Sequence, residues 1–405
     1  MTSVPAEDPQ ELASPAPLTP GPSPLRGRGE LTGASPPLPR AGAGTSRRRP
    51  ASLRDKIRAI LLLTDVLPVL PCRPLAWLTR QPDRQQVSFG GPGGSWVGQL
   101  YRPAGGGQRP GIVLFLGAAL DGQRDPRAER LAEGLARSGF ATLMCWSVAM
   151  QDGIFALEGL TLLEAAFEHL IARPEVDPAR MGFVGFCVGA AYTLVVAARP
   201  AIAERVAFVT AFAPYYSARD QIRAMATGRA FSGGSSRPWP VPWKKHTDSR
   251  YQFERLLLDA LEDDEERARV ADAVRQMAPE PAGISRAARA VYQLLSDAPF
   301  EGSDALMDQL PPRFLALVDG VSPRGQIDGL RAEMLVIHSA TDELIPVEES
   351  RCLVEYLKKT KTPTTYSELT MFEHTEVAGT ARLGTVAREC ARLTGDMQAL
   401  LRYAN

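Results

Sequence analysis

Short apolar runs alternate with amphipathic segments from about residue 85 onward. The runs are bounded by glycines and polar residues, which is typical of strands buried on both faces of a sheet. They lie at residues 112–116, 140–146, 181–186, 206–212 and 334–338. Residues 86–89 and 96–101 predict an opening antiparallel pair, and helical periodicity separates several of the later runs. This alternation predicts an α/β fold, with a mostly parallel central sheet and helices on both faces.

The pattern changes over residues 218–330, where few strand-like runs occur. Amphipathic periodicity there predicts one long helix over 253–277 and shorter helices over 284–295 and 314–318. We therefore expect residues 218–330 to form a helical cap inserted into the sheet domain. The two parts of that domain are residues 85–217 and 331–405.

Two segments precede the sheet domain. Residues 1–50 are rich in proline and glycine and almost without large apolar side chains, so we expect a disordered tail. Residues 51–84 predict an apolar helical segment that either packs on the domain or, through residues 54–70, contacts a membrane surface or a partner. Its prolines would shorten a surface helix, which favours packing on the domain. No apolar stretch is long enough to predict a membrane span.

Charge and cysteine content narrow the class of protein. Lys and Arg together number 46, as do Asp and Glu, so no strongly basic surface predicts nucleic-acid binding. The five cysteines are odd in number and widely scattered, which indicates neither a disulfide framework nor a zinc site. No secretory signal stands near residue 1. We expect a cytoplasmic protein that takes a small-molecule substrate and uses no cofactor or metal ion.

The segment Gly185-Phe186-Cys187-Val188-Gly189 carries the strongest chemical signal in the chain. It joins an apolar strand to an apolar helix, which is the setting of a nucleophile elbow. Such a turn is strained and closely packed, so small residues are required two positions before and after the nucleophile. A free cysteine can also be an ordinary core residue, but the paired glycines favour Cys187 as a nucleophile.

A cysteine nucleophile needs a base, and the chain has four histidines. His374 follows the last predicted strand, residues 364–369, in a loop from which a base could reach the elbow, and we predict it as the base. His338 lies within an apolar run, where a core role is favoured. His169 in a predicted helix and His246 in the predicted cap indicate structural or solvated positions.

The base needs a carboxylate that orients it. Asp342 follows the run 334–338 in a turn of small residues, at the carboxyl end of a strand, where open α/β sheets place their sites. We predict Asp342 as the acid; the alternatives are a turn-capping role for it and Glu343 as a weaker rival.

Further site residues follow from the same geometry. The oxyanion hole needs two N–H donors, which we assign to Val188, next after the nucleophile, and to Ala118, in the loop after the run 112–116. Trp239 and Trp243, in an aromatic and proline-rich stretch of the cap, are the predicted substrate contacts.

With these motifs the chain resembles the α/β-hydrolase superfamily and, within it, the dienelactone-hydrolase-like group. Gly-Phe-Cys187-Val-Gly is similar to the cysteine elbow of that group, Thr-Asp342-Glu-Leu-Ile-Pro to its acid turn, and Glu-His374 to its histidine loop. The resemblance covers residues 85–217 and 331–405; the cap is not part of the small dienelactone hydrolases.

The resemblance implies hydrolysis of an ester, lactone or thioester through an acyl-cysteine and a Cys-His-Asp catalytic triad. One alternative is acyl transfer, since polyhydroxyalkanoate synthases also combine a cysteine elbow with a cap between elbow and acid. The other is a non-catalytic hydrolase-fold module that binds a ligand or a partner.

Overall fold

The computed structural model describes most of the chain after residue 51. The described residues are 52–67, 73–117, 125–151, 155–232, 235–239, 247–296, 298, 300–370, 372–373, 376–377 and 383–404. The chain divides into two units, Met1–Pro39 and Arg40–Asn405, and every described residue belongs to the second. The predicted tail, residues 1–50, therefore lies outside the described residues.

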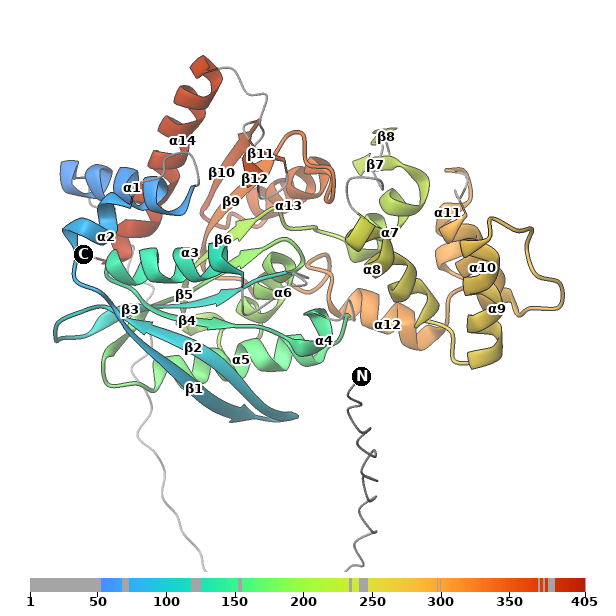
Figure 1. Cartoon of the computed structure of the whole chain (residues 1–405), viewed down its shortest axis with the longest axis horizontal. Coiled ribbons are helices and arrows are strands. Elements are labelled where there is room, and N and C mark those ends of the chain that lie inside the picture. Colours follow the sequence, from blue (N-terminus) through green and yellow to red (C-terminus); the bar gives the residue numbers. More distant parts are fainter. Residues whose placement is uncertain are drawn as a thin grey trace, which may run out of the picture. The chain divides into compact units, whose positions relative to one another are not determined.

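An eight-stranded sheet is the main element of the second unit (Figure 1). Its strands are β1 (Asp83–Gly91), β2 (Gly94–Arg102), β3 (Arg109–Phe115), β4 (Ala141–Cys145), β5 (Val176–Phe186), β6 (Val206–Phe212), β9 (Glu333–Ser339) and β10 (Thr364–Leu369). They lie in the order β1-β2-β4-β3-β5-β6-β9-β10, and β2 runs in the opposite direction to the other seven of these strands. The mostly parallel sheet and its opening antiparallel pair are confirmed.

Helices cover both faces of the sheet. Alternate residues of a strand point to opposite faces, so one strand contributes side chains to both helical layers. On one face, α1 (Leu53–Val66), α3 (Pro126–Arg137) and α14 (Leu383–Leu401) share an apolar cluster with Ile112 and Leu114 of β3. On the other face, Val113 and Phe115 of β3 belong to a second cluster. The helices of that cluster include α5 (Glu158–Ile171), α6 (Val188–Ala197) and α13 (Val347–Lys359). Strand β3 is thus buried on both faces, as its continuous apolar run predicts.

The residues between β6 and β9 are mostly helical, as predicted. They form α7 (Ala218–Thr227), a hairpin of β7 (Arg229–Ser232) and β8 (Ser235–Pro238), α8 (Thr247–Leu258), α9 (Asp264–Arg275), α10 (Arg286–Leu295), α11 (Ser303–Met307) and α12 (Pro312–Gly320). The hairpin was not predicted, and the single helix expected over 253–277 is wrong. It is interrupted because Asp263 caps the start of α9, its side chain accepting a hydrogen bond from the Glu266 N–H. The boundaries at residues 218 and 330 stay a prediction.

Helix α1 packs on the sheet domain. Its first turn has a capping box, in which Ser52 and Asp55 each accept a backbone N–H from the other. Ala59 and Leu62 on its inner side are buried in the cluster that α3 and α14 share. A peripheral contact through residues 54–70 stays a prediction. Among the helices of the described residues, none is long and apolar enough to cross a membrane.

The remaining described elements are short. They are α2 (Pro74–Leu78), α4 (Val148–Gln151), the two-residue strands β11 (Phe372–Glu373) and β12 (Glu376–Val377), and single 3-10 turns at Ala203–Arg205 and Arg402–Ala404.

Candidate active site

Cys187 lies at the turn between β5 and α6. Its φ of 54° and ψ of −131° are rarely adopted by residues other than glycine, so the backbone is strained here. The turn is fixed on both sides: the Cys187 N–H donates to the Phe212 carbonyl (2.8 Å), and the Ala190 N–H donates to the Cys187 carbonyl (3.0 Å). The cysteine is partly buried and lines a cavity.

The two glycines of the motif have no space for a side chain. A Cβ on Gly185 would lie 2.6 Å from the Ala190 Cα, and one on Gly189 would lie 2.7 Å from the Leu116 carbonyl oxygen. Both distances are far below van der Waals contact, and in both cases the obstacle is backbone. The close approach of β5, α6 and the end of β3 therefore requires glycine at both positions.

The end of β3 lies beside this turn. A Cβ on Gly117 would lie 2.9 Å from the Cys187 Cβ and 3.3 Å from the Val188 nitrogen. Val188 is the first residue of α6, and N–H groups in a first turn have no acceptor within the helix. Ala118, the second predicted oxyanion donor, lies outside the described residues. The structure thus places Gly117, the residue before Ala118, next to Cys187 and Val188.

Asp342 is buried in the turn that follows β9. Its Oδ1 accepts hydrogen bonds from the Leu344 N–H (2.8 Å) and the Ile345 N–H (2.9 Å). Leu344 and Ile345 line the same cavity as Cys187. The turn-capping geometry considered for Asp342 is therefore present, and it holds the aspartate directly behind the cavity wall.

His338 supports this turn from within the core. Its Nε2 lies 3.0 Å from the Ile345 carbonyl and 3.4 Å from the Asp342 Oδ2, and its Nδ1 lies 2.6 Å from the Ser350 Oγ. Because a carbonyl oxygen can only accept, Nε2 carries a proton. The ring is completely buried with both nitrogens hydrogen-bonded, which agrees with the core role favoured for His338.

Trp239 supports the same turn from the predicted cap. Its indole N–H donates to the Asp342 carbonyl (2.8 Å), and the ring is buried against Ala224 and Ala230. It is not among the residues that line the cavity. The side chain thus contacts the turn that holds Asp342, and the substrate contact predicted for Trp239 stays a prediction.

Two other predicted site residues, Trp243 and His374, lie outside the described residues, as does His246. The strands β11 and β12 are paired on either side of His374. His169 lies on α5 against Phe89, with the ring centroids 5.5 Å apart, as expected of a structural histidine.

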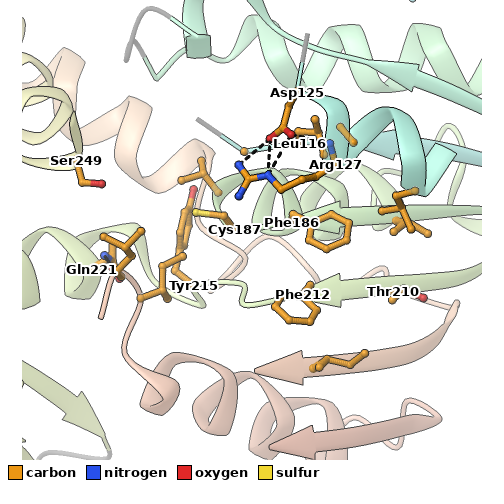
Figure 2. A pocket seen from close by; sticks show the side chains of 18 of the residues that line it. Leu116, Asp125, Arg127, Phe186, Cys187, Thr210, Phe212, Tyr215, Gln221 and Ser249 are labelled. Atoms are coloured by element: carbon orange, nitrogen blue, oxygen red, sulfur yellow. Dashed lines mark hydrogen bonds and ion pairs between the residues drawn. The ribbon is translucent and has the colours of Figure 1, made fainter. Parts of the chain in front are cut away.

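The cavity beside Cys187 has a volume of about 840 Å³, in the upper part of the range for small-molecule sites. Its lining is mainly apolar and comes from the sheet, from α1, α3 and α14, and from α7, α8 and α12. Figure 2 shows Cys187 between two groups of lining residues, with Gln221 and Ser249 on one side and Phe186, Phe212 and Thr210 on the other. Such a cavity can bind a largely apolar substrate against the thiol.

Residues 148–228, which run from α4 through the elbow to the end of α7, match the Dienelactone hydrolase family. This match confirms the predicted resemblance, and the strand order agrees with it. The protein has the α/β-hydrolase fold. None of the curated proteins compared matches the chain.

Several solved structures are similar to this chain at low sequence identity. An acylaminoacyl peptidase from Pyrococcus horikoshii is 13% identical with a TM-score of 0.47; the match covers 78% of this chain and 40% of the peptidase. A dienelactone hydrolase-like promiscuous phosphotriesterase from metagenomic libraries is 16% identical with a TM-score of 0.42, covering 78% and 99%. A thermostable carboxylesterase from a metagenomic library is 14% identical with a TM-score of 0.45, covering 87% and 98%. The chain thus spans less than half of the peptidase.

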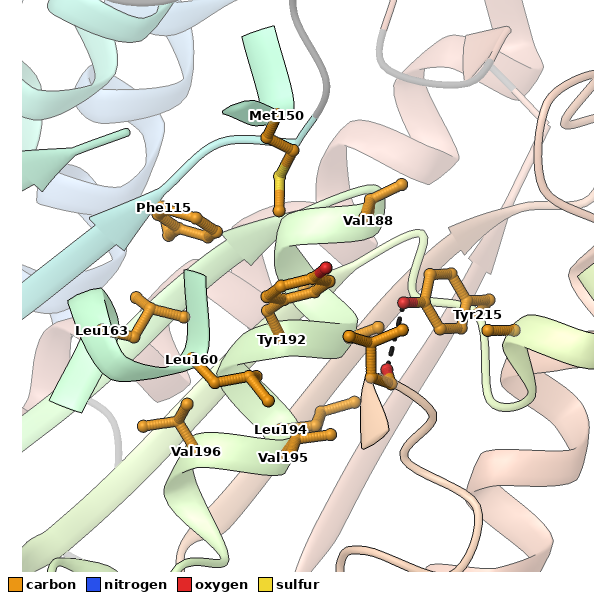
Figure 3. Close-up of a cluster of buried hydrophobic side chains, with 14 of the residues drawn as sticks. Phe115, Met150, Leu160, Leu163, Val188, Tyr192, Leu194, Val195, Val196 and Tyr215 are labelled. Carbon is orange, nitrogen blue, oxygen red and sulfur yellow. Dashed lines mark hydrogen bonds between the residues drawn. The ribbon is translucent and has the colours of Figure 1, made fainter. Parts of the chain in front are cut away.

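The α/β-hydrolase site also contains a tyrosine that the sequence analysis did not single out. Tyr215 lies beside Cys187 in the cavity wall, and its hydroxyl donates to the Val321 carbonyl (3.1 Å; Figures 2 and 3). Burial, together with the neighbouring Tyr192, Cys187 and Glu349, raises the pKa of Tyr215 well above its usual value, so it remains a neutral phenol. Its position just beyond the carboxyl end of β6 could have identified it.

A buried carboxyl group lies close to this tyrosine. Glu349 on α13 accepts hydrogen bonds from the N–H groups of Tyr216 and Ser217, both 2.8 Å long, at the start of α7. Burial raises the pKa of Glu349 to about 8, although these two N–H groups act in the opposite direction. No local sequence signal could have found it, because its partners are more than 130 residues away along the chain.

Proposed function

We propose that this protein hydrolyses a carboxylic ester, lactone or thioester through an acyl-cysteine intermediate. Cys187 is the nucleophile, His374 the base, and Asp342 the carboxylate that orients the base. The oxyanion is bound by the N–H groups of Val188 and Ala118. The observation that carries the proposal is the strained turn at Cys187, which is flanked by two obligatory glycines and borders a large apolar cavity.

His374 takes up or gives back a proton in each step of the proposed reaction. The base takes the thiol proton of Cys187, and the sulfur attacks the acyl carbonyl. The tetrahedral oxyanion gains two N–H hydrogen bonds and collapses to a thioester, while the leaving alkoxide or thiolate takes the proton from His374. Water then gives a proton to His374 and attacks the thioester; the second collapse releases the acid and restores the Cys187 thiol.

Two features of the described residues support these roles. Gly117 lies against both Cys187 and the Val188 nitrogen, which supports an oxyanion hole at this end of β3. The Asp342 carboxylate receives two backbone N–H hydrogen bonds, which fix its direction.

The test is the turnover of p-nitrophenyl esters and acyl-thioesters by wild type, Cys187→Ala and Cys187→Ser. We expect Cys187→Ala to lose about a thousand-fold or more in kcat. The matched control is Cys390→Ala, another partly buried free cysteine that does not line the cavity, and it should retain turnover.

The alternatives give different results in the same assay. Formation of a new ester when an alcohol is added, in place of free acid, would assign acyl transfer. Absence of turnover on every ester and thioester, together with no labelling of Cys187 by a thiol-directed acyl probe, would contradict the proposal in favour of a non-catalytic binding module.

A further inference from the structure

The cavity beside Cys187 extends in two directions that differ in chemistry. We call the space between the sheet and helices α1, α3 and α14 the sheet arm, and the space bordered by α7, α8 and α12 the cap arm. Figure 2 shows Cys187 between them, with Phe186, Phe212 and Thr210 on the side of the sheet arm and Gln221 and Ser249 on the side of the cap arm.

One side of the sheet arm, formed by α1, α14 and the strands, is aliphatic and aromatic, whereas the amino-terminal part of α3 adds the charged side chains of Asp125, Arg127 and Arg130. Apart from Thr210, every described side chain that α1, α14 and the strands contribute to it is apolar; those used below are Leu63, Val184, Ile337, Leu393 and Met397. Val184, Ile337 and Leu393 are each less than 5% exposed. The inner end of the sheet arm, at these three side chains, therefore lies below the surface, while Arg127 and Arg130 are exposed.

The cap arm contains polar side chains in addition to apolar ones. Gln221, Ser249 and Gln252 line it. The amide N–H of Gln221 donates to the Leu344 carbonyl (2.7 Å), while its Oε1 is buried and has no hydrogen-bond partner among the described residues. A buried acceptor without a donor is unfavourable, so a ligand that supplies a hydroxyl or amide N–H on this side would be stabilised.

A cleaved ester has an acyl side and a leaving-group side, and these two sides can differ in polarity. The two arms of the cavity differ in polarity as well. An alkyl chain gains free energy wherever it leaves water for apolar walls, and it has no polar group to satisfy Gln221. A polar alcohol or thiol has such groups, and they would find no hydrogen-bond partner among the buried apolar side chains at the inner end of the sheet arm.

We infer that the substrate is an acyl ester or thioester with a medium or long unbranched alkyl chain. The chain occupies the sheet arm, and the polar leaving group occupies the cap arm. This inference rests on the proposed function, because it takes Cys187 as the point where the two ends of the substrate meet. It also makes the amino-terminal helix α1 a part of the substrate site through Leu63.

The test is a series of p-nitrophenyl esters from acetate to decanoate with wild type and tryptophan variants. For wild type, kcat/KM should rise with chain length, by up to about four-fold for each added methylene. Leu63→Trp on α1 would fill the sheet arm and should lower the ratio of decanoate to acetate kcat/KM about ten-fold or more, which is the contribution of roughly two methylenes.

Three further variants keep the result interpretable. Leu131→Trp, a partly buried lining residue on α3, should lower the same ratio if Leu63→Trp does not fold. Ile60→Trp is the control, because Ile60 lies on the same helix, is 46% exposed and does not line the cavity; its ratio should equal that of wild type. A ratio lowered by Leu256→Trp in the cap arm but not by Leu63→Trp would overturn the assignment of the arms.

A binding measurement separates this inference from the proposed function. Calorimetry with the Cys187→Ala protein should show binding of p-nitrophenyl decanoate but not of p-nitrophenyl acetate. Adding Leu63→Trp to this variant should abolish the binding of the decanoate ester. That result without any ester turnover would support the sheet arm while contradicting the hydrolase. Turnover of acetate with no dependence on chain length, and no decanoate binding, would overturn this inference alone.

Discussion

The elbow and the acid turn lie on the same cavity but are held in place by different interactions. At the elbow, the support is backbone: Cys187 is fixed by main-chain hydrogen bonds on both sides, and Gly185 and Gly189 permit no side chain. At the acid turn, the support is side chains from distant parts of the chain, with the Trp239 indole and the His338 ring both reaching Asp342.

The difference teaches which half of the site a single sequence can reveal. Backbone crowding can be recognised in the local sequence, because it requires glycine at fixed spacing from the nucleophile. Side-chain support cannot be recognised in the local sequence, since Trp239 and Asp342 are 103 residues apart. The two halves should also fail differently when mutated.

The largest expected effect is on the elbow. Gly189→Ala should destabilise the protein by about 3 kcal/mol or more, because its Cβ meets the backbone of Leu116, which cannot move aside. Gly395→Ala is the matched control: it lies in α14 with nothing near a new Cβ, and should stabilise by about 0.5–1 kcal/mol. Urea unfolding measures both, and equal stability of the two variants would show that the elbow is not crowded.

The next largest effect is on the acid turn. Asp342→Asn should lower kcat/KM by about 100-fold or more, since an amide cannot orient and stabilise a protonated base as a carboxylate does. Glu343→Gln removes the neighbouring carboxylate and should change kcat/KM by less than about three-fold. Steady-state kinetics on one ester compares them. A greater loss in the Glu343 variant would transfer the acid role to the rival residue.

A third effect concerns pH, through Glu349. Its pKa in the folded protein, about 8, exceeds the ordinary value of 4.5, so the folded state binds more protons than the unfolded state between these values. Stability should therefore fall as pH rises from about 5 to 8, by at most about 1.4 kcal/mol per pH unit from this group. Glu349→Gln should flatten that dependence in urea unfolding at pH 5 to 8.5; an unchanged slope would contradict the buried neutral carboxyl.

The smallest effect is expected at Trp239. Trp239→Phe keeps most of the buried ring but removes the hydrogen bond to the Asp342 carbonyl, which should cost about 1 kcal/mol of stability. Because the residue does not line the cavity, KM should hardly change while kcat falls slightly. A KM increase of about ten-fold with unchanged kcat would support the substrate contact predicted for Trp239.

The sheet and the elbow were predictable because their signals are local. Buried parallel strands need continuous apolar runs, and β3, β4, β5, β6 and β9 all lie where such runs predicted them. The positive φ at Cys187 explains the glycine spacing that identified the motif. Asp342 was located by its place after a strand, for which strand pattern and turn residues suffice.

The cap and the far walls of the cavity were less predictable for physical reasons. Helix α8 ends at Leu258 and Asp263 caps the start of α9, but the amphipathic pattern of the sequence predicted one helix across this break. Leu63 in α1 and Leu393 in α14 line one cavity although they come from opposite ends of the described chain. Such pairings depend on the three-dimensional arrangement of α1, α3 and α14 and carry no signal in sequence spacing.

The most direct test of the proposed mechanism is mass spectrometry of the protein quenched in acid during turnover of a p-nitrophenyl ester. The account predicts one added acyl group, located on the peptide that contains Cys187 and absent from Cys187→Ala. Turnover with the acyl group on another residue, or with unmodified Cys187 throughout a measurable burst, would contradict Cys187 as the nucleophile.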